Sequence, residues 1–208
     1  MNSAILLVLK LPQYDTIALK EEMNEMILLA NTLSYNVVDV HIQSKNKIDS
    51  STYFGRGKIE SLKSILEELD IKILLINDEL NPSHYKNISK ICGKNITIID
   101  RTQLILDIFG DHAKTKESKT QVKVAKLEYL LPRLSGLWTH LERQAGGTGT
   151  RGGPGEKQIE IDRRLIKRDL GKLKNDLRNI DKQRNTQRKS RSNIFKIAIA
   201  GYTNAGKS

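Results

Sequence analysis

The sequence predicts an α/β fold: a small parallel β-sheet subdomain at the N-terminus, followed by a long antiparallel helical hairpin. Three observations support this prediction. Strand-like and helix-like patterns alternate over residues 1–100, and two heptad-spaced apolar seams flank a glycine-rich loop within residues 101–192. Residues 193–208 contain one more apolar run and a second glycine-rich motif, which predict the start of a third unit. Alternating strands and helices are typical of a parallel sheet covered by helices.

Four short apolar runs in residues 1–100 predict strands, and three amphipathic stretches between them predict helices. The strands are expected at Ala4–Leu9, Asn36–Ile42, Ile71–Ile76 and Ile96–Ile99, and the helices at roughly Thr16–Leu33, Lys58–Leu69 and Ser83–Ile91. Together these elements would form one compact, doubly wound layer.

Two loops of this half contain candidate functional residues. Gly55 and Gly57 stand at the start of the second predicted helix, where glycines can let an anion approach the helix N-terminus. We favour a tight turn here, because G-x-G without a third glycine is a weak nucleotide-binding signal. Asn77–Pro82 contains two carboxylates before a proline and predicts a capping loop rather than a catalytic pair. The only cysteine is Cys92, which excludes a disulfide framework and a cysteine-based zinc site.

Two apolar seams predict the helical hairpin. The first consists of Val124, Leu127, Leu131, Leu134, Trp138 and Leu141, and the second of Ile166, Leu170, Leu173, Leu177 and Ile180. Pro132 falls inside the first seam and predicts a kink or a break there. The second helix is expected from about Glu156 to Lys189, or on the order of 50 Å, which is too long to be buried in a domain of this size.

The positive charge is concentrated on this second helix. The chain has a net charge of +11, yet residues 1–100 contain 11 Lys and Arg against 13 Asp and Glu. Residues 157–191 contain 13 Lys and Arg against 5 Asp and Glu. This excess predicts contact with nucleic-acid phosphates, whereas a solvated coiled-coil face would have nearly balanced charge. Because this second helix, the basic arm, has almost no aromatic residues, structured RNA or DNA fits better as a partner than stacked single strands.

The loop at residues 144–155 contains six glycines, more than a helix connection needs. Such a tip can approach a nucleic-acid backbone closely, and a flexible linker is the alternative. The candidate contacts in the tip and on the following helix are Arg143, Gly146, Gly147, Gly149, Arg151, Gly152, Gly153, Gly155, Lys157, Arg163, Arg164, Lys167 and Arg168.

The last residues match the phosphate-binding P-loop. Ile194–Ala200 predicts a buried strand, and Gly201–Ser208 (GYTNAGKS) then matches G-x-x-x-x-G-K-[ST]. The backbone of Gly201, Tyr202, Thr203, Asn204, Ala205 and Gly206 would surround the phosphates. Lys207 would reach the β- and γ-phosphates, and the Ser208 hydroxyl would bind Mg²⁺. Hydrolysis needs further elements beyond this motif, so we expect the 208-residue chain to bind nucleotide weakly and not to hydrolyse it.

Five segments together resemble the HflX family of ribosome-associated GTPases. They are Phe54–Lys58 (FGRGK), Asp100–Phe109 (DRTQLILDIF), Lys126–Leu134 (KLEYLLPRL), Gly146–Arg164 (GGTGTRGGPGEKQIEIDRR) and Gly201–Ser208. The doubled Gly152-Gly153 is a departure, since the commonest form of the motif reads R-G-P-G-E.

The resemblance implies an α/β subdomain, a helical hairpin and a GTPase domain, of which this sequence would hold only the first strand and the P-loop. It also implies binding to the large ribosomal subunit and its RNA through Gly146–Glu156 and the basic arm. The cofactors implied are GTP or GDP with Mg²⁺, and Asn204 would help to hold a monovalent cation. The complete protein would couple GTP hydrolysis to ribosome rescue or splitting.

Two other functions are compatible with the sequence. One is a truncated, non-catalytic RNA- or ribosome-binding module, and the other is an ATP-dependent P-loop enzyme. An N-K-x-D motif about a hundred residues downstream would indicate guanine recognition. No apolar run approaches the roughly 18 residues that span a bilayer, and the N-terminus does not resemble a signal peptide. We therefore expect a cytoplasmic protein, with a monomer favoured.

Overall fold

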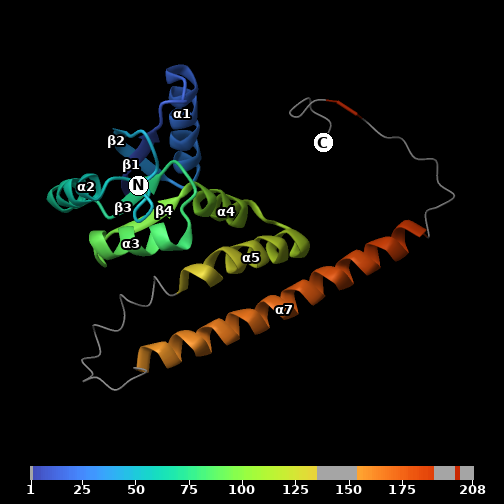
Figure 1. Ribbon diagram of the computed structural model, residues 1–208. Helices are drawn as coiled ribbons and strands as arrows, with labels where there is room; N and C mark the ends of the chain where they lie inside the picture. The colour runs from blue at the N-terminus through green and yellow to red at the C-terminus, as the bar shows by residue number, and fades with distance from the viewer. Residues whose placement is uncertain (1, 135–153, 190–199, 202–208) are drawn as a thin grey trace.

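The structure is a computed structural model, and it describes residues 2–134, 154–189 and 200–201 (Figure 1). Its elements are β1 (Asn2–Lys10), α1 (Thr16–Thr32), β2 (Tyr35–Ser44), α2 (Arg56–Glu68), β3 (Ile73–Ile76), α3 (Pro82–Cys92), β4 (Thr97–Asp100), α4 (Arg101–His112), α5 (Lys116–Leu130), the 3₁₀ turn η1 (Leu131–Arg133) and α7 (Pro154–Lys189).

The four strands form one parallel sheet in the order β2-β1-β3-β4. This confirms the predicted parallel α/β fold, with element bounds that differ from the predicted ones by only a few residues. β3 and β4 begin slightly later than expected. Ile71 and Ile96 belong to the predicted apolar runs and are buried, but they lie before the first paired residues of the two strands. The strand order reverses between β1 and β3, as it does in doubly wound sheets.

The core lies on both faces of the sheet, and the central strand β1 supplies side chains to each. Successive side chains of a strand point to opposite faces. Ile5, Leu7 and Leu9 therefore pack with residues of α2 and α3, whereas Ala4, Leu6 and Val8 pack with residues of α1 and α4. A strand that is buried on both sides reads as the continuous apolar run seen in the sequence.

Helix α4 covers the same face of the sheet as α1, and it is a helix that the sequence reading did not assign. It follows β4 directly, because Asp100 is both the last residue of the strand and the N-cap of the helix. Leu104 is fully buried in the core on this face. The strand-to-helix change has no glycine, proline or loop to mark it, so local sequence signals do not separate this helix from the strand before it.

Helices α5 and α7 lie side by side and run in opposite directions, and together they form the arm of the molecule (Figure 1). Two ion pairs between the helices follow this direction: Glu128 with Lys174 (2.6 Å), and Glu117 with Arg184 (2.7 Å). Burial on α7 follows the predicted second seam, since Leu170 is buried and its heptad neighbours Ile166 and Leu173 are half-buried. The first helix breaks at the predicted proline, with α5 ending at Leu130 and Pro132 lying in η1.

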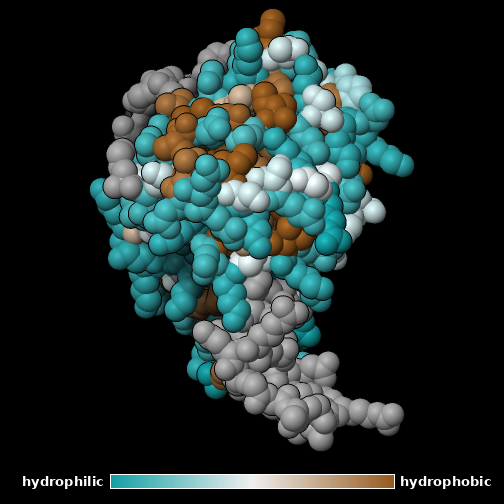
Figure 2. All heavy atoms as spheres, turned by 90° about the vertical axis from the view of Figure 1, so that its left-hand side faces the viewer, coloured by the Kyte–Doolittle hydropathy of each residue, from teal (hydrophilic) through white to brown (hydrophobic). Residues whose placement is uncertain are grey.

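Several predicted features lie outside the described residues. They include Trp138 and Leu141 of the first seam, and residues 194–199 of the last predicted strand. Ala200 and Gly201 are described, and both are exposed and irregular. Over the described part of the chain, no helix is long and apolar enough to cross a membrane. Figure 2 shows one face of the molecule, on which hydrophilic side chains surround an apolar patch.

Burial of Cys92 leads to a test of the core. The thiol lies between α2, α3 and the sheet with 2% of its surface exposed, and burial raises its pKa to about 12. Because the thiolate is the reactive species, the folded protein at pH 8 should react with a disulfide reagent far more slowly than an unfolded chain, whose thiol pKa is about 8.5. We expect the leaving thiol of the reagent to be released at least about a hundredfold more slowly in native buffer than in about 6 M guanidinium. Similar rates in the two buffers would contradict the described core.

Candidate functional site

The structure describes only some of the predicted site residues. Arg143, Gly146, Gly147, Gly149, Arg151, Gly152 and Gly153 of the tip, and Tyr202–Ser208 of the P-loop, lie outside the described residues. Gly155 and Lys157 belong to the first turn of α7. Arg163, Arg164, Lys167 and Arg168 lie further along the same helix, and Gly201 is exposed in the short described segment.

The predicted basic contacts of α7 that the structure describes are largely on its outer surface. Arg164, Lys167 and Arg168 are exposed, whereas Arg163 is half-buried beside the seam. Arg164 pairs with Glu160 at 3.2 Å, and Arg168 pairs with Asp169 at 3.6 Å. Such exposed ion pairs contribute only about 0–1 kcal/mol, so both guanidinium groups remain available to a stronger anionic partner.

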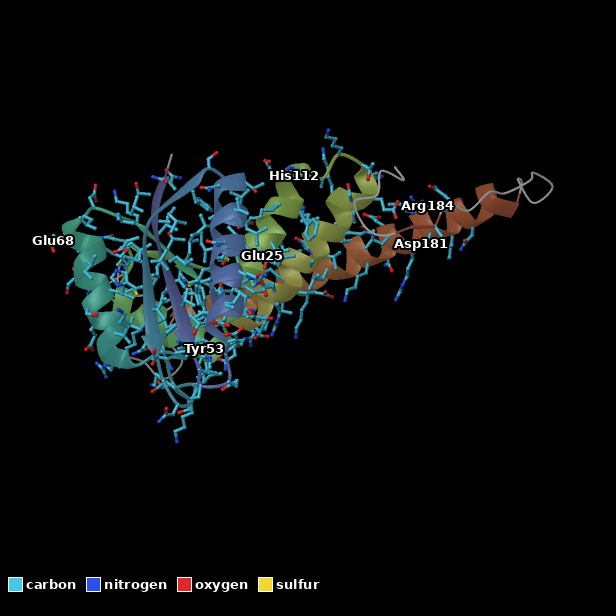
Figure 3. The ribbon with its side chains drawn as sticks, turned by 90° about the horizontal axis from the view of Figure 1, so that it is seen from above. Glu25, Tyr53, Glu68, His112, Asp181 and Arg184 are labelled. Atoms are coloured by element: carbon cyan, nitrogen blue, oxygen red, sulfur yellow. The ribbon has the colours of Figure 1, made fainter. Side chains whose placement is uncertain are left out.

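The outward basic residues form a stripe along α7. At 3.6 residues per turn, positions three or four apart share one face of a helix. Arg164, Lys167, Arg168, Arg178 and Lys182 therefore lie on the side opposite the buried seam, and all five are exposed. We call these five residues the outer stripe. Figure 3 shows, at Asp181 and Arg184, that α7 extends well past the α/β unit.

The structure also shows a second use of positive charge on α7. Lys174 and Arg184 pair with glutamates of α5, so they hold the two helices together and do not belong to the outer stripe. Asp162, Asp169 and Asp176 are seven residues apart and follow one flank of the helix. The total charge of the arm was readable from the sequence, but this division between seam, flank and outer face was not.

A second cluster joins the α/β unit to the arm, and its centre is Asp100. This carboxylate is completely buried. Its Oδ1 accepts a hydrogen bond from the Gln103 amide at 2.8 Å, and its Oδ2 accepts one from the Leu80 amide at 3.1 Å. The guanidinium Nη2 of Arg133, from η1, lies 3.7 Å from Oδ2. Asp100 therefore binds the start of α4, the loop after β3 and the end of the first arm helix.

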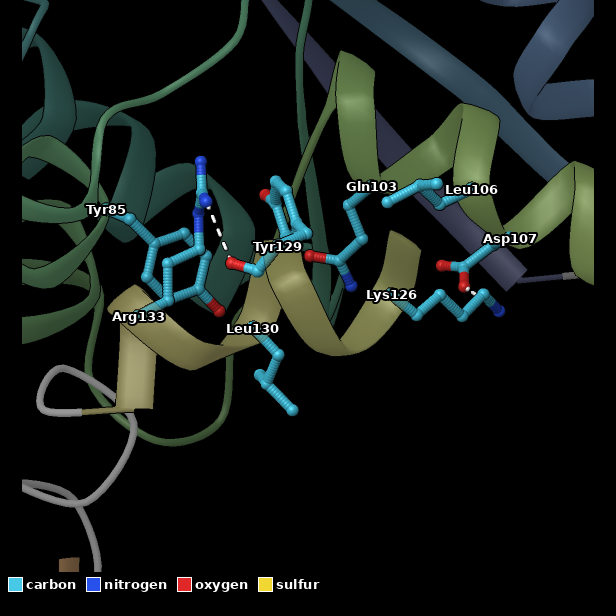
Figure 4. Close-up of a pocket in the computed structure, with 8 residues that line it drawn as sticks. All are labelled: Tyr85, Gln103, Leu106, Asp107, Lys126, Tyr129, Leu130 and Arg133. Atoms are coloured by element: carbon cyan, nitrogen blue, oxygen red, sulfur yellow. Dashed lines mark hydrogen bonds and ion pairs between the residues drawn. The ribbon is translucent and has the colours of Figure 1, made fainter. Parts of the chain in front are cut away.

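Arg133 is buried at this junction, where several groups contact its guanidinium (Figure 4). It donates hydrogen bonds to the carbonyl oxygens of Leu80 and, at 2.9 Å, of Tyr129. Its guanidinium carbon lies 3.6 Å from the centroid of the Tyr129 ring, a cation–π geometry. Burial, and then the negative charge of Asp100, raise the pKa of the Tyr129 phenol. This cluster was missed in the sequence, although both of its segments were singled out in the family resemblance.

The FGRGK segment leads into helix α2, with Gly55 in an extended conformation and residues 56–58 in the first turn of the helix. Gly55 is the N-cap of α2, and its N–H donates to the Gln43 side chain at 2.8 Å. A Cβ at Gly55 would lie 2.8 Å from Gln43 Nε2, so the glycine permits this close contact. Arg56 points outward and pairs with Glu60. The segment is therefore a helix start and not the tight turn that we favour from the sequence, because the turn lies just before it, at residues 49–53.

The Asn77–Pro82 segment is the capping loop that the sequence predicts. Asn81 is the N-cap of α3, and its side chain accepts a hydrogen bond from the His84 amide at 2.7 Å. Pro82 occupies the first helical position, where a missing N–H costs nothing. In the described part of the chain, no group of three or more His, Cys, Asp and Glu side chains could hold a metal ion.

Comparison with known proteins first defines the class. Residues 20–110 match the family model described as GTP-binding GTPase N-terminal, and residues 112–191 match the model described as GTP-binding GTPase Middle Region. The boundary between these two matches falls at the end of α4. The chain is therefore built from the N-terminal and middle regions of a GTP-binding protein.

Similar curated proteins specify the family. The chain is 47% identical over 190 residues to the GTPase HflX of Flavobacterium psychrophilum, covering 91% of this chain and 45% of the relative. It is 43% identical to the GTPase HflX of Magnetococcus marinus, with 100% and 48% covered, and 37% identical to that of Escherichia coli, with 90% and 44% covered. The chain belongs to the HflX GTPase family, and it spans about half the length of these relatives.

Solved structures share the fold. A crystal structure of SsGBP in complex with GDP matches with a TM-score of 0.65 at 24% identity, covering 98% of this chain and 49% of that one. A GTP-binding protein from the archaeon Sulfolobus solfataricus, in complex with GDP, matches with a TM-score of 0.59 at 25% identity, covering 87% and 46%.

The junction can be tested with Arg133→Met, which keeps an unbranched side chain and removes the guanidinium. Breaking a buried ion pair by removing one partner costs about 3–5 kcal/mol, because the other charge stays buried. We expect a loss of about 3 kcal/mol in the free energy of unfolding, measured by urea denaturation. Arg56→Met removes an exposed partner of Glu60 and should cost less than about 1 kcal/mol. Equal losses in the two variants would show that Arg133 is not a structural centre.

Proposed function

We propose that this chain is the N-terminal, ribosome-binding part of an HflX-type GTPase. In the complete protein, this part would couple GTP binding and hydrolysis to rescue or splitting of ribosomes. Family membership supports the GTPase assignment. The outer stripe of α7 is the observation that supports an RNA partner, because it places five exposed cations on one projecting face.

The large ribosomal subunit is the partner that we propose for this arm. Ribosomal RNA presents closely spaced phosphates, and neutralising them releases counterions, which favours binding at low salt. The stripe would follow the RNA backbone, with arginines making paired hydrogen bonds to phosphate oxygens. The glycine-rich tip at residues 144–155 would approach the RNA backbone at the end of the arm, with Arg143, Arg151 and Lys157 adding charge there.

Nucleotide binding is assigned to Gly201–Ser208. Its glycines would let backbone N–H groups surround the phosphates of GTP or GDP, and Lys207 would neutralise the β- and γ-phosphates. The Ser208 hydroxyl would hold Mg²⁺, which supplies charge neutralisation when bound. Asn204 would contribute to a monovalent-cation site. We propose that the protein works in the cytoplasm as a monomer, where ribosomes and GTP are both present.

Charge reversal tests the RNA-binding face. A variant with Arg164, Lys167, Arg168 and Arg178 of the outer stripe replaced by Glu should co-sediment at least tenfold less with large ribosomal subunits at low salt, since several phosphate contacts are lost. The remaining binding should also depend less steeply on salt concentration, because fewer counterions are released.

The matched control reverses four lysines of the α/β unit that are outside the arm, Lys20, Lys72, Lys86 and Lys94. It changes the net charge by the same amount and should retain subunit binding. If the two variants lose affinity equally, only overall charge matters and the stripe has no specific role.

The nucleotide site is tested in the complete protein with Lys207→Ala. Loss of the lysine leaves the terminal phosphates without their main cation, so we expect at least a tenfold weaker affinity for a fluorescent GTP analogue. Excess unlabelled GTP should displace the probe and excess ATP should not. Displacement by ATP alone would instead indicate an ATP-dependent enzyme, while unchanged affinity in Lys207→Ala would remove the P-loop from the proposal.

A further inference from the structure

A small cavity lies between the α/β unit and the arm (Figure 4). Its volume is about 190 Å³, and it is lined by Tyr85 of α3, Gln103 and Leu106 of α4, Tyr129 and Leu130 of α5, and Arg133 of η1. Apolar surface predominates in its walls. Neither the proposed RNA contacts nor the P-loop uses any of these residues.

The cavity accounts for two sequence segments that the proposed function leaves unexplained. Apart from Tyr85, every residue of its lining belongs to Asp100–Phe109 or to Lys126–Leu134. These two segments meet where α4 packs against α5. A concave, largely apolar site with a few converging polar groups is the usual form of a small-molecule site.

The charged groups around the cavity are already neutralised by one another. Lys126 and Asp107 form an ion pair of 2.6 Å within the lining. Arg133 faces the buried carboxylate of Asp100 at 3.7 Å, whereas the carboxylate of Glu79, 4.0 Å away, is exposed to solvent. A bound anion or cation would find no unbalanced opposite charge to compensate its lost hydration. This balance favours an uncharged ligand.

Two polar atoms of the lining lack a hydrogen-bond partner in the described part of the chain, the Tyr129 hydroxyl and Arg133 Nε. Arg133 has only 6% of its surface exposed, and its Nε is buried without a hydrogen-bond acceptor among the described residues. A buried donor left unpaired costs about 1–3 kcal/mol, so an acceptor supplied by a ligand would be stabilising. The Gln103 side-chain amide, also in the lining, can both donate and accept a hydrogen bond.

The size and walls of the cavity limit the ligand further. A protein cavity of about 150 Å³ holds one benzene ring, so this one fits a single ring with small substituents. The Tyr85 and Tyr129 side chains provide flat walls against which a planar ring can pack.

We propose that this cavity binds an uncharged, planar, single-ring compound that carries an amide, with its carbonyl oxygen directed at Arg133 Nε and its N–H at Gln103. The pyrimidine ring of uracil has this chemistry. Because α3 and α4 form one side of the cavity and α5 and η1 the other, the bound ring would contact both the α/β unit and the arm.

The Arg133 Nε–H group provides a direct measurement. In a ¹⁵N-labelled sample of the 208-residue chain, its cross-peak can be assigned by its loss in Arg133→Lys. Uracil should shift this peak saturably, because a new acceptor changes the shielding of the proton. Benzene, which has the ring without the acceptor, should bind at least tenfold more weakly. No saturable shift with uracil, or equal binding of benzene, would overturn the proposal.

Two variants test the location of the site. Leu106→Trp fills the cavity and should weaken uracil binding at least tenfold, whereas Leu28→Trp, at an exposed position of α1, should leave it unchanged. Gln103→Leu keeps an apolar wall and should also lose at least tenfold, which retains a test if Leu106→Trp fails to fold. Undiminished binding in folded Gln103→Leu would contradict the assigned pose.

Uridine separates two sources of the ring. Binding of uracil alone would indicate a free base, since a ribose would not fit, and equal binding of uridine would indicate a nucleoside or an RNA nucleotide. Either result supports the site. Failure of both compounds would refute it, and leaves the ribosome-binding proposal intact because the outer stripe is a separate surface.

Discussion

The buried carboxylate of Asp100 is the constraint on which the rest of the structure depends. It caps α4, accepts the Leu80 amide from the loop after β3, and faces Arg133 of η1. Several kcal/mol oppose the burial of an unpaired charge, so these contacts have to form together. The end of the sheet and the start of the arm are consequently joined at one buried point, and the direction of the arm is set by the edge of the sheet.

The arm itself separates two uses of positive charge. Lys174 and Arg184 bridge to glutamates of α5 and keep α7 aligned, while the outer stripe remains exposed on the opposite side. The ion pairs of Arg164 and Arg168 lie within α7, so their carboxylates can be replaced without separating the helices, whereas those of Lys174 and Arg184 bridge α7 to α5. The seam and the outer stripe therefore lie on opposite sides of one helix. Packing of the seam against α5 fixes the orientation of α7, and the outer stripe consequently faces outward.

Local sequence patterns predict much of the secondary structure of this molecule, but they do not predict contacts between residues that are far apart in the sequence. The apolar strands, the Asn81 cap and the break at Pro132 follow from neighbouring residues, so they could be predicted. Arg133 hydrogen-bonds to Leu80 across 53 positions, and Asp100 reaches Leu80 across 20. No period or motif records such a distance. The same limit applies to the outer stripe. The sequence predicts the positive charge of α7, but only the position of α5 shows which of its cations contact α5 and which are exposed. The tip and the P-loop stay predictions.

The position of the cavity connects these features through thermodynamic linkage. A ligand that contacts both walls of the cavity stabilises only the arm orientation that brings these walls together. At a concentration a hundred times its dissociation constant, the stabilisation is about 2.7 kcal/mol. That energy is similar to the expected contribution of Arg133 to the junction. If RNA binds the outer stripe in the same orientation, ligand and RNA favour each other's binding by equal amounts, because linkage is reciprocal. An empty cavity would then leave the arm held mainly by Asp100 and Arg133. The junction would thus be the place where a small molecule changes the proposed ribosome affinity without touching the outer stripe.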